Sequence, residues 1–217
     1  MQTVGFYRNG VDADICDFSK VIEDLHYQFS TCFPKPNVSY YMSDVQSGIK
    51  YSVDYISSNE TIVLCTHGCK DGLYYDFGLR KFLIDKNNID IIKNRCIIAI
   101  SCWTLFTRSI FRTSMNQSKV FLGFQEDFYM ASTPCNVPDE QVFVLNMYAD
   151  ILINAIVEVS VTNGTFQDLR DAIKKSAVER SRVRKGIDSV YVGVALSRLT
   201  TVDLVGDGTT RLLPEHP

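Results

Sequence analysis

The sequence predicts an α/β fold in which helices cover both faces of a mostly parallel central sheet. Short apolar runs rich in isoleucine and valine, at residues 61–66, 96–101 and 120–124, have the composition of strands buried in a parallel sheet. Segments with helical spacing alternate with these runs along the chain. The 217 residues contain no internal repeat, linker or low-complexity stretch, so we expect one domain over residues 1–217 with a sizeable core.

The composition is that of an ordinary globular protein with reduced thiols. Apolar residues make up 46%, charged residues 22%, and the net charge is -3, which gives no default affinity for nucleic acid or for an anionic membrane. The seven cysteines are an odd number and most lie in apolar runs, which favours a reducing compartment over a disulfide framework. The first residues lack the basic and then apolar pattern of a signal peptide, so we expect a cytoplasmic location.

The first third of the chain alternates strand and helix signals. The turn signal Asn9-Gly10 ends the first strand, and Pro34 and Pro36 end the first helix. In order, we expect a strand at 3–7, a helix at 18–29, a strand at 38–42, a segment at 47–56 that fits either a helix or a strand, and a strand at 61–66.

The middle of the chain carries two more strands. Asp71-Gly72 marks a loop before them, and Asn87-Asn88 interrupts a weakly helical stretch. In order, we expect a loop at 69–77, one or two short helices within 79–92, a strand at 96–101, a helix at 103–115, a strand at 120–124 and a long loop at 125–139.

The last third is predicted to be mainly helical. The longest helix, 141–159, has polar residues at steps of four, which leaves one narrow wet stripe on a largely buried helix and argues against a transmembrane span. The stripe is formed by Asn146, Asp150, Asn154 and Glu158. After it we expect a helix at 165–185 capped by Thr165, a strand at 190–199 and a turn-rich tail at 202–217.

Two reactive side chains follow buried strands. His67, which precedes Gly68, comes directly after the run 61–66, and Cys102 comes directly after the run 96–101. The carboxyl ends of parallel strands line the crevice where open α/β sheets place their sites, so we expect both side chains in one crevice. A thiol beside an imidazole forms a cysteine nucleophile with its base.

Several features favour acyl transfer by these groups. A free cysteine ionises near pH about 8.5, and a helix starting after Cys102 would place the positive end of its dipole at the sulfur. His67 would accept the thiol proton or pair with the thiolate. Gly68 lets a substrate backbone approach, and its N–H together with that of Cys102 would hold an oxyanion. We therefore predict peptide-bond hydrolysis that uses neither a metal nor an organic cofactor.

Two other interpretations stay open. Cys65, His67 and Cys69 alternate along the chain and would share one face of an extended strand, which suits zinc, although Gly68 interrupts the alternation. The chain could also be a catalytically inactive scaffold or binding module. The presence of both reactive residues favours the enzyme.

The motifs CTHG, AISC and VFLGF, in this order, resemble those of the caspase-like (clan CD) cysteine peptidases, and CHAT-domain proteases are the most similar branch. That branch has a strand ending in His-Gly, a later strand ending in Ser-Ala-Cys and then a strand ending in Gly-Phe or Gly-Thr. The segments FVLNMYADIL, FQDLRDAIKKSA and VGDGTTRLL also resemble such domains, so the resemblance spans residues 40–213. The chain departs from the branch at Ile100, where a small residue is common, and it lacks the caspase active-site pentapeptide.

The resemblance implies a caspase-like three-layer sandwich with Cys102 as nucleophile, His67 as general base and Gly68 as oxyanion donor. Several relatives outside the caspases cleave after lysine or arginine and use an acidic residue in the first specificity pocket. Asp127 is our first candidate for that acid, followed by Glu126 and Asp71, and a solvated loop carboxylate is the alternative for each.

The expected partners are a protein or peptide substrate and an activating protein, as in prokaryotic defence or cell-death systems where such domains are effectors. No sensor domain or prodomain is visible in the sequence, and the apolar helix 141–159 offers one surface for the activator. We assign no site role to His26, His216, the basic run at 180–185, which fits a wet helix face, or Trp103, which fits the core.

Overall fold

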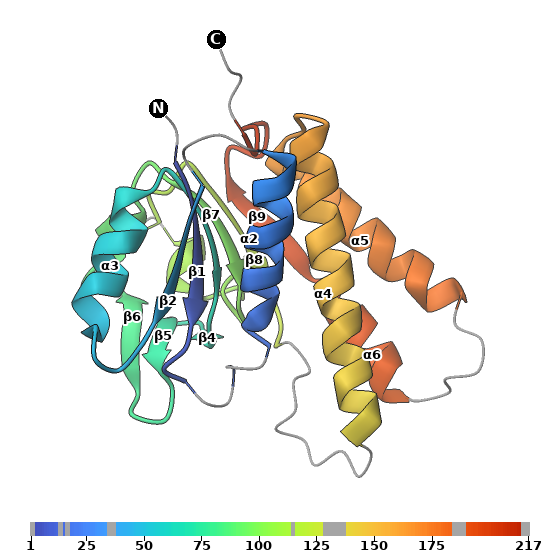
Figure 1. Cartoon of the computed structure of the whole chain (residues 1–217), viewed down its shortest axis with the longest axis horizontal. Helices are drawn as coiled ribbons and strands as arrows, with labels where there is room; N and C mark the ends of the chain where they lie inside the picture. The colour runs from blue at the N-terminus through green and yellow to red at the C-terminus, as the bar shows by residue number, and fades with distance from the viewer. Residues whose placement is uncertain are drawn as a thin grey trace.

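The structure is a mixed, mostly parallel sheet with helices on both faces, which confirms the predicted α/β class (Figure 1). A computed structural model describes residues 3–12, 15, 18–33, 38–113, 116–127, 138–183 and 190–213, except for the side chains of 138–141, 183 and 190–191. Within these residues the chain forms five α-helices and a six-stranded main sheet. The architecture is that of three layers, with the sheet in the middle.

The main sheet has the strand order β2-β1-β3-β7-β8-β9. Its first five strands run parallel, and β9 is antiparallel to β8. Four strands, β1, β3, β7 and β8, are buried along their whole length, as expected for a sheet covered on both faces. The strands are β1 (Val4–Asn9), β2 (Val38–Ser43), β3 (Thr61–Cys65), β7 (Cys96–Ile100), β8 (Val120–Phe124) and β9 (Val202–Gly206).

A small antiparallel sheet follows β3 directly. It consists of β4 (Gly68–Cys69), β5 (Gly72–Asp76) and β6 (Lys81–Asp85), and the short 3-10 helix η1 (Ile89–Ile92) comes next. In Figure 1 this sheet lies at the end of the main sheet toward which the arrow of β1 points. It therefore builds one wall beside the carboxyl ends of the parallel strands.

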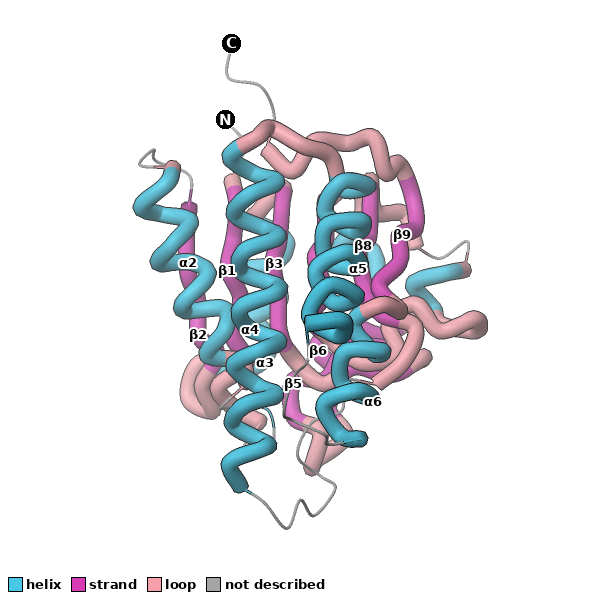
Figure 2. The backbone as a smooth tube through the Cα atoms, turned by 90° about the vertical axis from the view of Figure 1, so that its right-hand side faces the viewer, coloured by secondary structure: helices cyan, strands magenta, loops and turns pink. Residues whose placement is uncertain are grey.

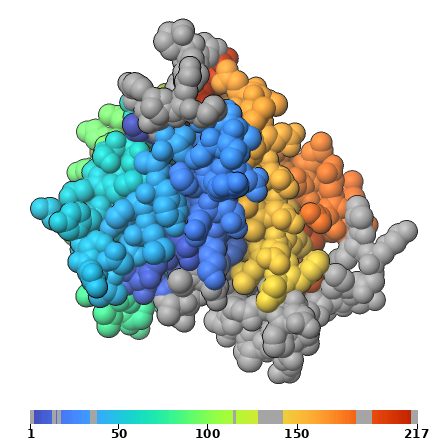
Figure 3. Space-filling model, in the orientation of Figure 1, coloured from blue at the N-terminus to red at the C-terminus, as the bar shows by residue number. Residues whose placement is uncertain are grey.

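Four helices cover one face of the main sheet and one helix covers the other. Helix α3 (Gly48–Ser58) lies on the side of the small sheet, whereas α2 (Lys20–Cys32), α4 (Pro138–Val161), α5 (Phe166–Val183) and α6 (Val190–Leu199) lie on the opposite side (Figures 1 and 2). The strands send alternate side chains to two cores, so that Val63 packs toward the four helices and Ile62 toward α3 and the small sheet. In the space-filling view the surfaces of α2 and α4 adjoin on one face (Figure 3).

Helix α4 is largely a core helix, as its pattern predicted. The four polar residues spaced by four, Asn146, Asp150, Asn154 and Glu158, are exposed, and the apolar side chains between them are mostly buried. By length and composition alone Val142–Val161 would suffice to cross a membrane, with a mean hydropathy of 1.7, but half of it is buried inside the protein. Buried core helices meet the same criterion, so α4 is accounted for by its packing.

Two predictions for the last third are wrong. The segment 190–199 is a helix, α6, because Val192, Ala195 and Leu199 recur with helical spacing and are buried on one side. The strand that completes the sheet is β9, in a stretch we predicted to be turns. The predicted cap of α5 is confirmed, since Thr165 and Asp168 exchange hydrogen bonds in a capping box.

The segment that follows β3 also differs from its prediction. Residues 69–77 and 79–92 were expected to be a loop and short helices, but they form the small sheet and η1. Leu73, Tyr75, Leu83 and Ile84 fill the core beneath α3. The ambiguous segment 47–56 lies within α3, a helix.

Candidate active site

Part of the site predicted from the sequence lies beside the point where the strand order reverses. The order β2-β1-β3 means that the chain leaves β1 toward one side and later builds β3 on the other, so β1 and β3 flank the topological switch point. Ligands in open α/β sheets bind beyond the carboxyl ends of the strands at this point. Asn9 ends β1 and Asp12 follows it, His67 follows β3, and Cys102 follows the next strand, β7.

The strand register brings His67 and Cys102 to the same level. Strands β3 and β7 are parallel neighbours, and Cys65 pairs with Ile100. His67 and Cys102 each come two residues later, beyond the strand ends, so both lie past the same edge of the sheet. There the two side chains have different neighbours, because Cys102 packs against the four-helix core and the His67 ring stacks on Phe77.

Two contacts tie the ends of these strands together. The Ser101 hydroxyl donates a 2.6 Å hydrogen bond to the carbonyl of Thr66. Gly68 lies directly against the nucleophile segment, because a Cβ at this position would clash with the carbonyl oxygen of Cys102 and lie 3.1 Å from the Ser101 Cβ. Glycine is therefore required here by the close approach of two segments of the protein's own backbone, whereas we had predicted that it admits a substrate backbone.

The loop after Cys102 corrects our prediction of a helix over 103–115. The described part of this segment consists of turns and one short 3-10 helix, η2 (Ile110–Arg112), so no helix dipole points at the sulfur. The Ser109 and Thr104 hydroxyls donate to main-chain carbonyls of the loop, and such bonds compete with helix formation. Within the described residues, the Cys102 thiolate therefore gains no stabilisation from a helix dipole.

The same loop holds a strained residue next to Cys102. Trp103 has φ +57°, a conformation rare for bulky side chains, and its N–H donates to the Glu126 carbonyl at 3.2 Å. Its side chain is 41% exposed, so our expectation that it packs in the core is wrong. Leu105 N–H bonds the carbonyl of Phe124, which fixes the loop on the end of β8. Backbone strain of this kind concentrates at functional sites.

His67 has a buried carboxylate as its neighbour. Its Nε2 lies 3.8 Å from Asp12 Oδ2, and the side chain of Asp12 is only 4% exposed. The Nε2 atom is itself buried and makes no hydrogen bond among the described residues. Phe77 stacks on the imidazole with ring centres 4.8 Å apart, and the Phe77 N–H donates to Asp12 Oδ2 at 3.1 Å. The ring is therefore held between an acid and an aromatic side chain.

Asn9 is the hub that fixes Asp12 and the end of β3. Its side-chain oxygen accepts from the N–H groups of Val11 and Asp12, and its amide donates to the Thr66 hydroxyl at 2.8 Å and to the carbonyl of Tyr75. We interpreted Asn9 only as a turn signal, and we missed Asp12. Their position just after a parallel strand was the signal available, because carboxyl ends of such strands share one edge.

The thiols of the described residues differ in reactivity. Burial raises the pKa of the Cys65 thiol well above its usual value, and the nearby Cys102 adds to this rise. Burial also raises the pKa of Cys96. Cys102 is partly exposed at the edge of the four-helix core, so it is more accessible than either.

The zinc alternative finds no support in the geometry. Within the described part of the chain, no three histidine, cysteine or acidic side chains are placed to hold a metal ion. Cys65 is fully buried in the core, whereas the Cys69 sulfur lies beside the Tyr74 hydroxyl at 3.6 Å in the small sheet. Because β3 ends at Cys65, the alternation needed for a shared ligand face does not continue to Cys69.

The acidic candidates for substrate recognition have different surroundings. Glu126 and Asp127 both form ion pairs with Arg198 at the end of α6, the second at 3.3 Å. The backbone of Glu126 is held beside the nucleophile loop by its bond to Trp103. Asp71 instead pairs with its neighbour Lys70 in an exposed turn, which leaves that turn neutral.

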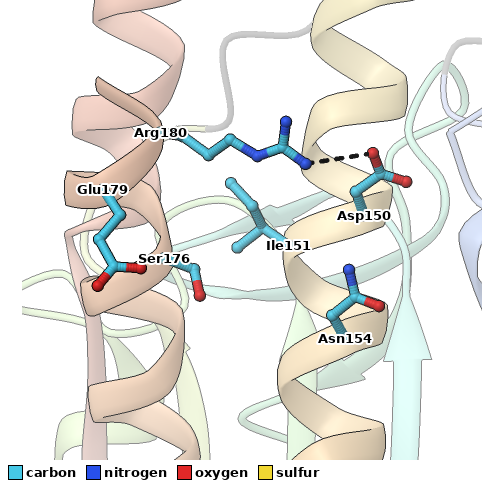
Figure 4. A pocket seen from close by; sticks show the side chains of 6 residues that line it. All are labelled: Asp150, Ile151, Asn154, Ser176, Glu179 and Arg180. Atoms are coloured by element: carbon cyan, nitrogen blue, oxygen red, sulfur yellow. Dashed lines mark ion pairs between the residues drawn. The ribbon is translucent and has the colours of Figure 1, made fainter. Parts of the chain in front are cut away.

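A groove lies away from His67 and Cys102. It is a groove of about 340 Å³ between α4 and α5, and the Arg180–Asp150 ion pair crosses it at 3.6 Å (Figure 4). Asn154, Ser176 and Glu179 complete its polar walls (Figure 4). It contains neither a thiol nor an imidazole, so we do not assign the chemistry to it.

No family model matches this chain, and neither a curated protein nor a solved structure matches it. The functional argument therefore depends on the fold and on the geometry of the site.

Proposed function

We propose that the protein is a cysteine endopeptidase of the caspase-like type that uses Cys102 as nucleophile and His67 as base. The observation that supports the proposal is the register of β3 and β7, in which Cys65 pairs with Ile100, so that His67 and Cys102 each follow by two residues at the same edge of the sheet. The α/β architecture, with a mostly parallel sheet between helices, is the one expected for caspase-like peptidases. The close approach of Gly68 to Cys102 is consistent with the proposal.

The reaction would proceed in two stages. His67 takes the Cys102 proton, the thiolate attacks the scissile carbonyl, and the N–H of Gly68 helps to hold the oxyanion. The imidazolium then returns the proton to the leaving amine as the C–N bond breaks, which leaves a thioester on Cys102. Water, deprotonated by His67, hydrolyses the thioester and releases the acid product.

We propose that cleavage follows a basic residue. Two carboxylates, Glu126 and Asp127, face one guanidinium, Arg198, so this cluster retains one net negative charge beside the nucleophile loop. Exposed ion pairs of this type are weak, so a substrate lysine or arginine can compete with Arg198. Asp71 is a poorer candidate, because Lys70 already neutralises it.

The remaining parts of the proposal concern location and activation. We propose a cytoplasmic effector that is switched on by a protein partner, and neither a nucleic acid nor a membrane is part of the mechanism. Helix α4 offers only its ends for association, because Val142, Phe143 and Val161 are exposed while most of its other apolar side chains are buried.

Thiol labelling tests the catalytic pair without a known substrate. The protein is treated with limiting iodoacetamide, and the modified sites are mapped by mass spectrometry. We expect Cys102 to react first among the seven cysteines and to lose this preference in His67→Ala. Cys32, which is exposed, is the internal control, since its reactivity should not depend on His67.

A peptide library supplies the second test, with basic and neutral residues at the cleavage position. Cleavage that is lost in Cys102→Ala supports the endopeptidase. Uniform slow labelling of the exposed thiols, with no cleavage in the presence of cell lysate as a source of activator, would instead indicate the scaffold.

A further inference from the structure

Asp12 is the carboxylate nearest to the reactive imidazole, and nothing in the sequence pattern assigned it a role. It lies 3.8 Å from His67 Nε2, within ion-pair range but too long for a hydrogen bond. A carboxylate this deeply buried is costly unless charge or hydrogen bonds compensate it. The Phe77 N–H supplies one such bond, and the unbonded Nε2 of His67 faces the same oxygen.

We infer that Asp12 is a positioning residue that holds His67 in the Nε2–H tautomer, so that Nδ1 is the nitrogen that exchanges the proton with Cys102. This inference rests on the proposed function. A carboxylate accepts hydrogen bonds and cannot donate them, so the ring nitrogen that faces it must carry the proton. Catalytic hydrogen bonds are often long in unliganded enzymes and shorten on substrate binding.

The surroundings of Asp12 suit a fixed orienting group. Asn9 accepts the Asp12 N–H, and the same Asn9 bonds the Thr66 hydroxyl one residue before His67. One side chain thus sets the distance between the acid and the imidazole from both sides. Phe77 stacks on the ring and also donates to the acid, so rotation of the imidazole would break the stack.

Spectroscopy of the histidine ring tests the inference directly. The chain has only three histidines, so the ¹⁵N resonances of His67 can be assigned by comparison with His67→Ala. We expect neutral His67 to be the Nε2–H tautomer in the wild type and to shift toward Nδ1–H in Asp12→Asn, because the asparagine amide can donate to Nε2. Asp76→Asn is the matched control, since Asp76 directly precedes Phe77 in the hairpin of β5 and β6 but bonds the Leu79 N–H.

Kinetics provide the second readout. With a cleaved peptide as substrate, Asp12→Asn should lower kcat on the order of 10- to 100-fold with little change in KM. This loss is smaller than the whole contribution of a positioned acid–base group, because His67 itself remains. Asp12→Glu, which keeps the charge, should restore part of the Nε2–H tautomer. Circular dichroism on each variant identifies any loss of folding.

The outcomes separate the inference from the proposed function. An Nδ1–H tautomer in the wild type, or no tautomer change in folded Asp12→Asn, overturns the positioning role even if peptides are cleaved. The expected tautomer shift in a protein that cleaves no peptide supports the positioning role and counts against the protease.

Discussion

Gly68→Ala should separate the two strand ends that carry the chemistry. The added Cβ would fall closer than 3.0 Å to the Cys102 carbonyl oxygen, and it would lie 3.2 Å from the Thr104 Cγ2. Ordinary contact begins near 3.4 Å, so the nucleophile segment must move by more than about 0.4 Å. Gly68 does not have a positive φ, so the cost is one of crowding and not of backbone strain.

The expected size of the effect follows from this displacement. Overpacking costs about 1–3 kcal/mol, and the reduced entropy of the unfolded alanine chain offsets about 0.4–1 kcal/mol of it. A net loss of about 1–2 kcal/mol lowers Tm by roughly 2–8 °C in a chain of this length. A misplacement of up to 1 Å at reacting groups costs up to about 100-fold in rate, so alkylation of Cys102 should slow by about 10- to 100-fold.

The assay pairs thermal unfolding with the rate of iodoacetamide labelling at Cys102. Gly78→Ala is the control, because its new Cβ would meet only the Asp76 carboxylate at 3.6 Å, and its Tm should stay the same or rise slightly. A Gly68→Ala protein with unchanged Tm and unchanged labelling would show that the start of β4 and the loop at Cys102 are not in close contact.

Two further outcomes are expected. Arg198→Ala should raise the rate of cleavage after lysine or arginine by about 3- to 10-fold, because it removes an internal competitor for Glu126 and Asp127. Asp127→Ala should lower that rate, and both variants are measured with peptides that differ only at the cleavage position. Unchanged rates in both variants would exclude these carboxylates from substrate recognition. Asp168→Asn should destabilise the protein at pH 7 by only about 0.3–0.5 kcal/mol, because solvent screens this exposed carboxylate. Hydrogen bonds from the Thr165 N–H and then its hydroxyl lower the pKa of Asp168 below its usual 3.8. The Asp168 carboxylate stabilises the folded protein at pH values above 3.8, and this stabilisation is lost as the pH falls through the lowered pKa. In urea unfolding, the free energies of unfolding of the wild type and Asp168→Asn should therefore differ less at pH 3 than at pH 7.

The strands that precede His67 and Cys102 could be predicted because their patterns are unambiguous. The runs around Val63, Ile98 and Leu122 are apolar on both faces, and only a sheet covered on both sides buries such strands completely. The positions of His67 and Cys102 followed from this, since each residue directly follows such a strand. The exposed stripe of α4 was also predictable from its spacing of four residues.

The parts that failed depend on contacts between distant segments. The run from Val192 to Leu199 is rich in valine yet helical, because packing against the four-helix core overrides its strand propensity. The loop after Cys102 has a helical apolar pattern, but hydroxyl bonds to its own carbonyls and bonds to the end of β8 determine its path. The sequence offered no reason to place Asp12 near His67, because their contact depends on the pairing of β1 with β3.

Strand β1 has a neighbour on each side, and this position affects how the chain folds. Although β1 is the earliest strand along the polymer, it pairs with β2 on one side and β3 on the other. Both ladders must therefore form before the first strand is enclosed, and the loop that carries Asn9 and Asp12 takes its final shape only after residue 66 has emerged. A deletion that removes β1 should leave β2 without a partner and divide the sheet, so an N-terminal truncation is expected to abolish folding and not merely to weaken catalysis.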